Sequence, residues 1–118
     1  MVEINFIKGV KERTVPKIKV YRSNDGRSGK ALFIFEKPEI FLDNSSLKIK
    51  GMFLIDKEGE LFTRDISIFN SSKKEESSIE AIYSWTTIND FHRFLRFASS
   101  YAEYNGIGYP MNKKGIIK

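Results

Sequence analysis

The sequence contains no cysteine and only one histidine, His92. Without cysteine the chain can form neither a disulfide framework nor a thiolate metal site. A single imidazole also leaves few metal ligands and little acid–base capacity near neutral pH. We therefore expect no catalytic residue, no cofactor and no bound metal.

Long hydrophobic runs are also lacking. No apolar segment of the chain approaches the roughly 20 residues that a membrane-spanning helix requires. The N-terminus alternates like a strand from Val2 to Phe6 and shows neither a signal peptide nor an Arg- and Ser-rich presequence. We expect a soluble protein that works in the compartment where it is translated.

The length and composition indicate one globular unit. The chain has 118 residues, of which 41% are hydrophobic, so residues 1–118 are expected to form a single domain with a real core. Residues 107–118 contain a lysine pair and are expected to be a partly flexible basic tail. The net charge of +5 suggests an anionic partner, although acidic residues are interleaved with the basic ones.

Six segments have the alternating or continuous apolar pattern of β-strands, namely 2–7, 17–22, 30–36, 48–56, 60–69 and 79–85. Asp25-Gly26 predicts a tight turn between the second and third segments. Residues 57–59 predict a second hairpin, whose first strand would present Ile49, Phe53 and Ile55 on one face.

The last segment leads into a predicted amphipathic helix. Its proposed core stripe is Ile88, Phe91, Phe94, Leu95, Ala98, Tyr101 and Ala102. Thr87 and Asp90 have the spacing of a helix cap, and Asn105-Gly106 is a typical helix end. The fold class is therefore α+β, a mostly antiparallel sheet of about six strands covered by one long C-terminal helix.

Three groups of polar residues were considered as sites. Asp56, Glu58 and Glu60 have the spacing of acidic metal ligands but match no complete calcium loop, so solvated turn residues explain them better. The segment 23–29 could bind an anion through backbone N–H groups, but a tight turn is the simpler interpretation. His92 is expected to be an exposed surface residue.

The outer side of segment 17–22 is a candidate binding surface. Lys17, Lys19 and Tyr21 project away from the apolar side of this strand. They form either an ordinary solvated sheet face or a basic patch for an acidic partner or an anionic membrane surface. An exposed edge strand could in addition accept an extended segment of another protein.

The order of motifs resembles that of the photosystem II assembly factor family Psb28. The matching segments are Ile4-Asn5-Phe6-Ile7-Lys8-Gly9, Val15-Pro16, Arg22-Ser23-Asn24-Asp25-Gly26-Arg27-Ser28-Gly29-Lys30-Ala31, Phe35-Glu36-Lys37-Pro38, Gly51-Met52-Phe53-Leu54, Thr63-Arg64 and Glu80-Ala81-Ile82-Tyr83. The helix contributes Phe91, Arg93-Phe94, Arg96-Phe97, Tyr101-Ala102 and Asn105-Gly106. Departures from the family pattern include Ile88 in place of its usual proline and Phe91 in place of its common tryptophan.

The resemblance implies a non-catalytic protein at the thylakoid membrane, peripheral and on the cytoplasmic side in a cyanobacterium or the stromal side in a plastid. It would bind immature photosystem II transiently through the inner antenna protein CP47 and the reaction-centre proteins D-one and D-two. The candidate partner-binding residues are Lys17, Lys19, Tyr21, Arg22 and Arg27, with Arg93 and Arg96 on the outer helix face as a second patch. The alternative is a small basic nucleic-acid-binding domain, which only the charge and the exposed Lys, Arg and Tyr side chains support; the resemblance implies no nucleic acid.

Overall fold

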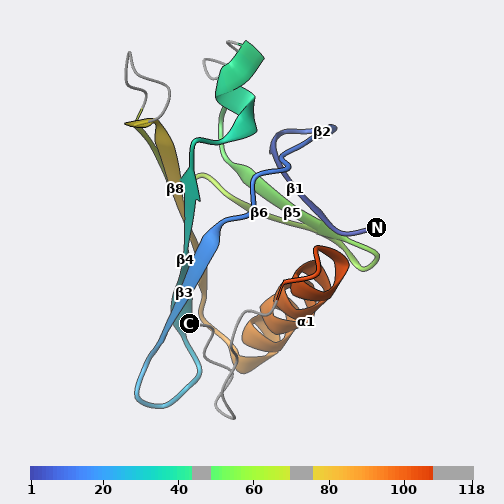
Figure 1. Ribbon diagram of the computed structural model, residues 1–118. Helices are drawn as coiled ribbons and strands as arrows, with labels where there is room; N and C mark the ends of the chain where they lie inside the picture. The colour runs from blue at the N-terminus through green and yellow to red at the C-terminus, as the bar shows by residue number, and fades with distance from the viewer. Residues whose placement is uncertain (44–48, 70–75, 108–118) are drawn as a thin grey trace.

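A computed structural model describes residues 1–43, 49–69 and 76–107 (Figure 1). The predicted tail, residues 107–118, lies outside the described residues apart from Ile107. The elements, in chain order, are β1 (Glu3–Ile7), β2 (Val10–Lys11), β3 (Lys17–Arg22), β4 (Gly29–Glu36), the short 3₁₀ helix η1 (Glu39–Asp43), β5 (Met52–Asp56), β6 (Gly59–Thr63), β7 (Ile66–Phe69), β8 (Ser78–Trp85) and α1 (Ile88–Tyr104).

The strands form two antiparallel sheets rather than one. Sheet A has the order β2-β1-β5-β6, and sheet B has the order β3-β4-β8-β7. The described residues thus hold eight strands, and the prediction of about six was too low. The added strands are the two-residue β2 and the split of segment 60–69, where the chain leaves sheet A after Thr63 and enters sheet B at Ile66.

The crossing between the sheets is held by two hydrogen bonds to the same residue of β8. The Thr63 hydroxyl donates to the Ile82 carbonyl oxygen at 2.6 Å, and the Ile82 N–H donates to the Asp65 carbonyl oxygen at 2.8 Å. These bonds satisfy backbone groups that would otherwise lose their partners where the strand changes sheets. They also fix the position of sheet A relative to sheet B.

The helix α1 lies in the angle between the two sheets (Figure 1). Its buried residues are Phe91, Phe94, Phe97, Ala98 and Tyr101. The inner face of β4 contributes Ala31, Phe33 and Phe35 to the same core, and β5 contributes Met52 and Leu54. Phe94 is at the centre, with ring centroids 6.1 Å from Phe33, 5.7 Å from Tyr83 and 5.2 Å from Trp85.

Both predicted ends of the helix are confirmed. The Thr87 hydroxyl accepts a hydrogen bond from the Asp90 N–H at 3.1 Å, which satisfies one free donor of the first turn. Gly106 follows the C-terminal cap with a φ of 65°, a conformation that glycine adopts without steric cost. Ile88, in contrast, is 40% exposed and does not belong to the core.

The second hairpin has the predicted turn, and Phe53 and Ile55 lie on one face of β5, as expected. That face is only partly covered, whereas Met52, Leu54 and Asp56 on the opposite face are buried. Because apolar side chains occupy both sets of alternate positions, the sequence pattern does not show which face is buried.

Burial raises the pKa of Tyr101 from its ordinary value of 10.0 to about 12, with a smaller contribution from the negative charge of Glu12. A raised folded-state pKa means that the folded protein holds this proton more tightly than the unfolded chain. The resulting stability is complete below pH 10 and is lost as the pH rises toward 12. Urea unfolding of the wild type and of Tyr101→Phe across this range measures it, and the variant is expected to show a clearly shallower decline. Parallel declines would contradict the assignment.

Candidate functional site

The predicted outer surface of β3 has the expected alternation. Ile18 and Val20 are buried, and Lys17, Lys19 and Tyr21 are exposed on the other side. Among the described residues β3 is the edge strand of sheet B, and the side chains on its outer face are exposed. We call Lys17, Lys19, Tyr21 and Arg27 the hairpin surface, because Arg27 is exposed in the turn that joins β3 to β4.

The cations of the hairpin surface differ in how far they are neutralised. Lys17 Nζ lies 2.9 Å from Glu36 Oε1, and this hydrogen bond lowers the pKa of the Glu36 carboxyl. Within the described ranges, Lys19 forms no ion pair. The turn itself is ordered by Asp25, whose carboxylate accepts hydrogen bonds from the Ser23 hydroxyl at 2.6 Å and the Arg27 N–H at 3.0 Å. Positive charge is thus most available toward the turn end of the hairpin.

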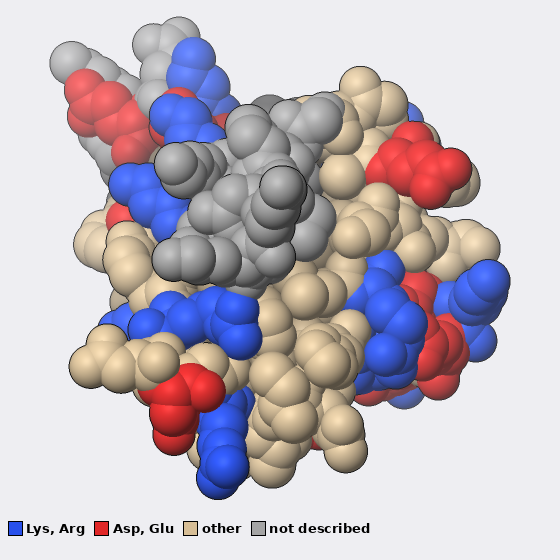
Figure 2. Space-filling view, turned by 90° about the horizontal axis from the view of Figure 1, so that it is seen from below, with Lys and Arg blue, Asp and Glu red and all other residues tan. Residues whose placement is uncertain are grey.

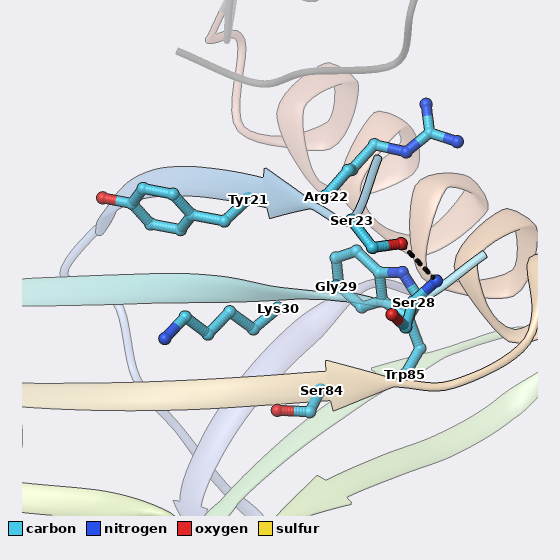
Figure 3. A pocket seen from close by; sticks show the side chains of 8 residues that line it. All are labelled: Tyr21, Arg22, Ser23, Ser28, Gly29, Lys30, Ser84 and Trp85. Atoms are coloured by element: carbon cyan, nitrogen blue, oxygen red, sulfur yellow. Dashed lines mark hydrogen bonds between the residues drawn. The ribbon is translucent and has the colours of Figure 1, made fainter. Parts of the chain in front are cut away.

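Arg22 is separated from the other residues of this group. One guanidinium nitrogen of Arg22 donates to the Gly26 carbonyl oxygen at 2.9 Å, and the guanidinium carbon lies 4.1 Å from the centre of the Phe91 ring. Figure 3 shows the Arg22 side chain on the side of β3 opposite to Tyr21. Arg22 therefore joins the hairpin to α1, and its stacking on an aromatic ring is an interaction that lysine would not reproduce.

The second predicted patch, Arg93 and Arg96, is not a single outer surface. Arg93 is only 17% exposed and faces the β5–β6 turn, where its two terminal nitrogens donate to the Asp56 carboxylate at 2.8 and 2.7 Å. The expectation that Arg93 lies on the outer helix face was wrong, because the helix is tucked against sheet A at this point. Arg96 is 55% exposed and donates to both oxygens of Glu58, at 2.8 and 3.0 Å.

The three carboxylates considered as metal ligands each contact a basic side chain. Asp56 pairs with Arg93, Glu58 pairs with Arg96, and Glu60 lies 2.9 Å from Lys8 Nζ. The hydrogen bond from Arg96 lowers the pKa of Glu58. Asp56 is not a solvated turn residue, since its side chain is only 4% exposed. Periodicity could not reveal the two arginine pairs, because they join residues 37 and 38 positions apart.

Figure 2 shows basic side chains in two groups on either side of a surface without charged side chains. Acidic side chains lie beside the basic ones in both groups. In the parts of the chain that the structure describes, no helix has both the length and the apolar character to cross a membrane. His92 is exposed on α1, as predicted.

The fold defines a small α+β protein of two antiparallel sheets and one long helix, with exposed basic side chains on the β3–β4 hairpin. A family model for the Psb28 protein matches residues 4–109. The chain is similar to proteins named "Photosystem II reaction center Psb28 protein": 44% identical to that of Synechococcus sp. strain CC9902 over 94% of this chain and 84% of the relative, and 47% identical to that of strain WH7803 over 92% and 84%. The Prochlorococcus marinus strain MIT 9515 relative is 43% identical over 96% of both chains. The chain belongs to the Psb28 family.

Proposed function

We propose that this protein is a non-catalytic assembly factor that binds transiently to immature photosystem II. The observation that carries the proposal is the family match over residues 4–109, together with relatives whose names place them with photosystem II. The partners are CP47 and loops of the reaction-centre proteins D-one and D-two. The protein works as a peripheral protein of the thylakoid membrane, on the cytoplasmic side in a cyanobacterium or the stromal side in a plastid.

Residues 1–118 act as one domain in this proposal. No cofactor or metal takes part. The protein would hold loops of the immature complex in one conformation by binding that conformation more tightly than the mature one. A ligand can shift such an equilibrium only by its difference in affinity for the two states, so release follows once assembly favours the mature loops.

The hairpin surface is the first candidate for the contact. Among the described residues β3 is the edge strand of sheet B, and Lys19, Tyr21 and Arg27 are exposed in the same hairpin. An extended partner segment could pair with the edge while its acidic side chains meet these cations. Arg93 already binds Asp56, and Arg96 already binds Glu58, so both would have to exchange partners to take part.

The double variant Lys19→Ala/Arg27→Ala tests this surface. Both side chains are exposed, and neither forms an ion pair with another described residue, so their removal should leave the fold intact. We expect binding to solubilised immature photosystem II to weaken by roughly fivefold, about 1 kcal/mol for two exposed charges. Surface-immobilised protein titrated with the purified complex gives the affinity.

The matched control is Lys50→Ala/Lys57→Ala, which removes the same charge from exposed positions at the ends of β5. It should bind like the wild type. Equal weakening by both double variants would mean that only the net charge matters, and the hairpin surface would lose its assignment. Arg22→Ala is unsuitable for this test, because it also removes the contact with Phe91.

A further inference from the structure

A hollow of about 330 Å³ opens where β3 ends, β4 begins and β8 ends (Figure 3). It lies on the outer side of sheet B, where Tyr21, Lys30 and Ser84 are neighbours in one row across the three strands. The volume is at the lower end of the range for small-molecule sites. Its size therefore suits one small polar group.

The residues that line the hollow are strongly biased toward hydrogen-bond donors. They include three serines, Ser23, Ser28 and Ser84, and two basic residues, Arg22 and Lys30, while none of the described lining residues is acidic. Most protein hydroxyls can act as donor or acceptor, but ammonium and guanidinium groups only donate. This combination favours a negatively charged ligand rich in acceptor atoms.

Two of the serine hydroxyls are available to a ligand. The Ser23 hydroxyl donates to Asp25 and accepts from the Ser28 N–H at 3.2 Å, so it is occupied. The hydroxyls of Ser28 and Ser84 form no hydrogen bond with any other described residue. The chain thus presents two uncommitted hydroxyl donors, Ser28 directly before β4 and Ser84 in the neighbouring β8.

Lys30 can supply the charge. Its side chain is exposed, has no ion pair among the described residues, and lies with Nζ 6.0 Å from the centre of the Tyr21 ring. A lysine on a flexible stem is a common point-charge ligand for phosphate. Arg22 points away from Lys30, toward α1, and adds only its more distant positive charge (Figure 3).

The hollow also adjoins the one tryptophan of the chain. A Cβ added at Gly29 would lie 2.8 Å from Trp85 Cζ2, so the indole packs directly against the Gly29 backbone. The buried indole N–H of Trp85 has no hydrogen-bond partner among the described residues. A ligand at Ser28 and Gly29 would therefore change the surroundings of a unique fluorophore.

We propose that this hollow binds an oxyanion, a phosphate or sulfate group, through the hydroxyls of Ser28 and Ser84 and the ammonium group of Lys30. The group could be a free anion or part of a lipid headgroup. The inference concerns the isolated protein and does not depend on the association with photosystem II.

The test is a titration of the isolated protein with inorganic phosphate at constant ionic strength, followed by Trp85 fluorescence. We expect a saturable change in emission that equimolar chloride does not produce. Lys30→Gln should raise the apparent Kd at least fivefold, and Ser84→Ala should raise it severalfold. The control Lys57→Gln, an exposed residue outside both the hollow and the hairpin surface, should leave the Kd unchanged.

Nuclear magnetic resonance gives a second reading that does not depend on emission intensity. The amide signals of Ser28 and Gly29 and the indole signal of Trp85 should shift together with phosphate, and the amide of Lys57 should not. A non-saturable response, or equal affinity of Lys30→Gln and the wild type, would overturn the proposal.

The source of the anion is resolved with vesicles. Vesicles of phosphatidylcholine with about 30% phosphatidylglycerol provide an anionic membrane surface. Their binding is compared with that of vesicles of pure phosphatidylcholine. Binding to the anionic vesicles that phosphate displaces and Lys30→Gln weakens supports a lipid headgroup. Phosphate binding without vesicle binding supports a free anion.

Discussion

Arg93→Ala is expected to lower the free energy of unfolding by about 3 kcal/mol. The substitution removes both hydrogen bonds to Asp56, whose side chain is 4% exposed, and leaves that carboxylate buried without its cation. It also removes the aliphatic stem of the arginine from the contact between α1 and sheet A. Urea unfolding followed by circular dichroism gives the difference.

Arg96→Ala is the matched control for this prediction. Arg96 makes an equally short bidentate contact with Glu58, but both side chains are substantially exposed, and such pairs contribute little. We expect a much smaller loss of stability than for Arg93→Ala. The double variant Arg93→Met/Asp56→Leu should recover most of the stability, because it removes the buried charge as well. If Arg93→Ala and Arg96→Ala lost the same amount, the Asp56 pair would have no special role.

Phe94→Ala is expected to have the largest effect on stability, a loss of about 4 kcal/mol. Phe94 is fully buried, and its ring contacts aromatic rings from β4 and β8, namely Phe33, Tyr83 and Trp85. The loss combines the transfer free energy of the ring with the cost of a cavity that rigid strands cannot close. Calorimetric or urea unfolding measures it.

Ile88→Ala tests the same helix at a position that the sequence pattern also assigned to the core. Ile88 is 40% exposed, so we expect a change within about 0.5 kcal/mol. A loss at Ile88 comparable to that at Phe94 would mean that the first turn of α1 is covered. Phe94→Leu, which keeps much of the apolar volume, should fall between the two.

The features that the sequence predicts well are local. The hairpin turns depend on Asp25-Gly26 and on residues 57–59, and the helix ends depend on Thr87 and Gly106. Each of these signals lies within a few residues of the structure that it determines. The motif resemblance likewise led to the Psb28 family, which the family model and the relatives show.

The features that the sequence does not predict are non-local. The change of sheet between Thr63 and Ile66 depends on hydrogen bonds to Ile82, which is far along the chain. The polar residues 63–65 alone do not distinguish such a change from a polar stretch within one continuous strand. The burial of Asp56 follows from the position of α1 against β5, which no spacing within either element encodes. The hollow beside Trp85 forms only when three separate strand ends meet.

The partner-binding residues remain a prediction, but the structure separates the exposed ones from those that already interact within the chain. Lys19, Tyr21 and Arg27 are exposed in the hairpin, whereas Arg22, Arg93 and Arg96 already interact within the chain. The sequence does not indicate which carboxylate or aromatic ring a basic side chain will contact in the fold. For this reason net charge overstates how much of the surface is open to a partner.

The most direct test of the proposed function is affinity capture from detergent-solubilised thylakoid membranes with a tagged copy of the full chain, followed by identification of the captured proteins. We expect CP47 together with D-one and D-two, without the finished oxygen-evolving complex. Capture of nucleic acid, or of no photosystem II protein, would contradict the assembly-factor proposal.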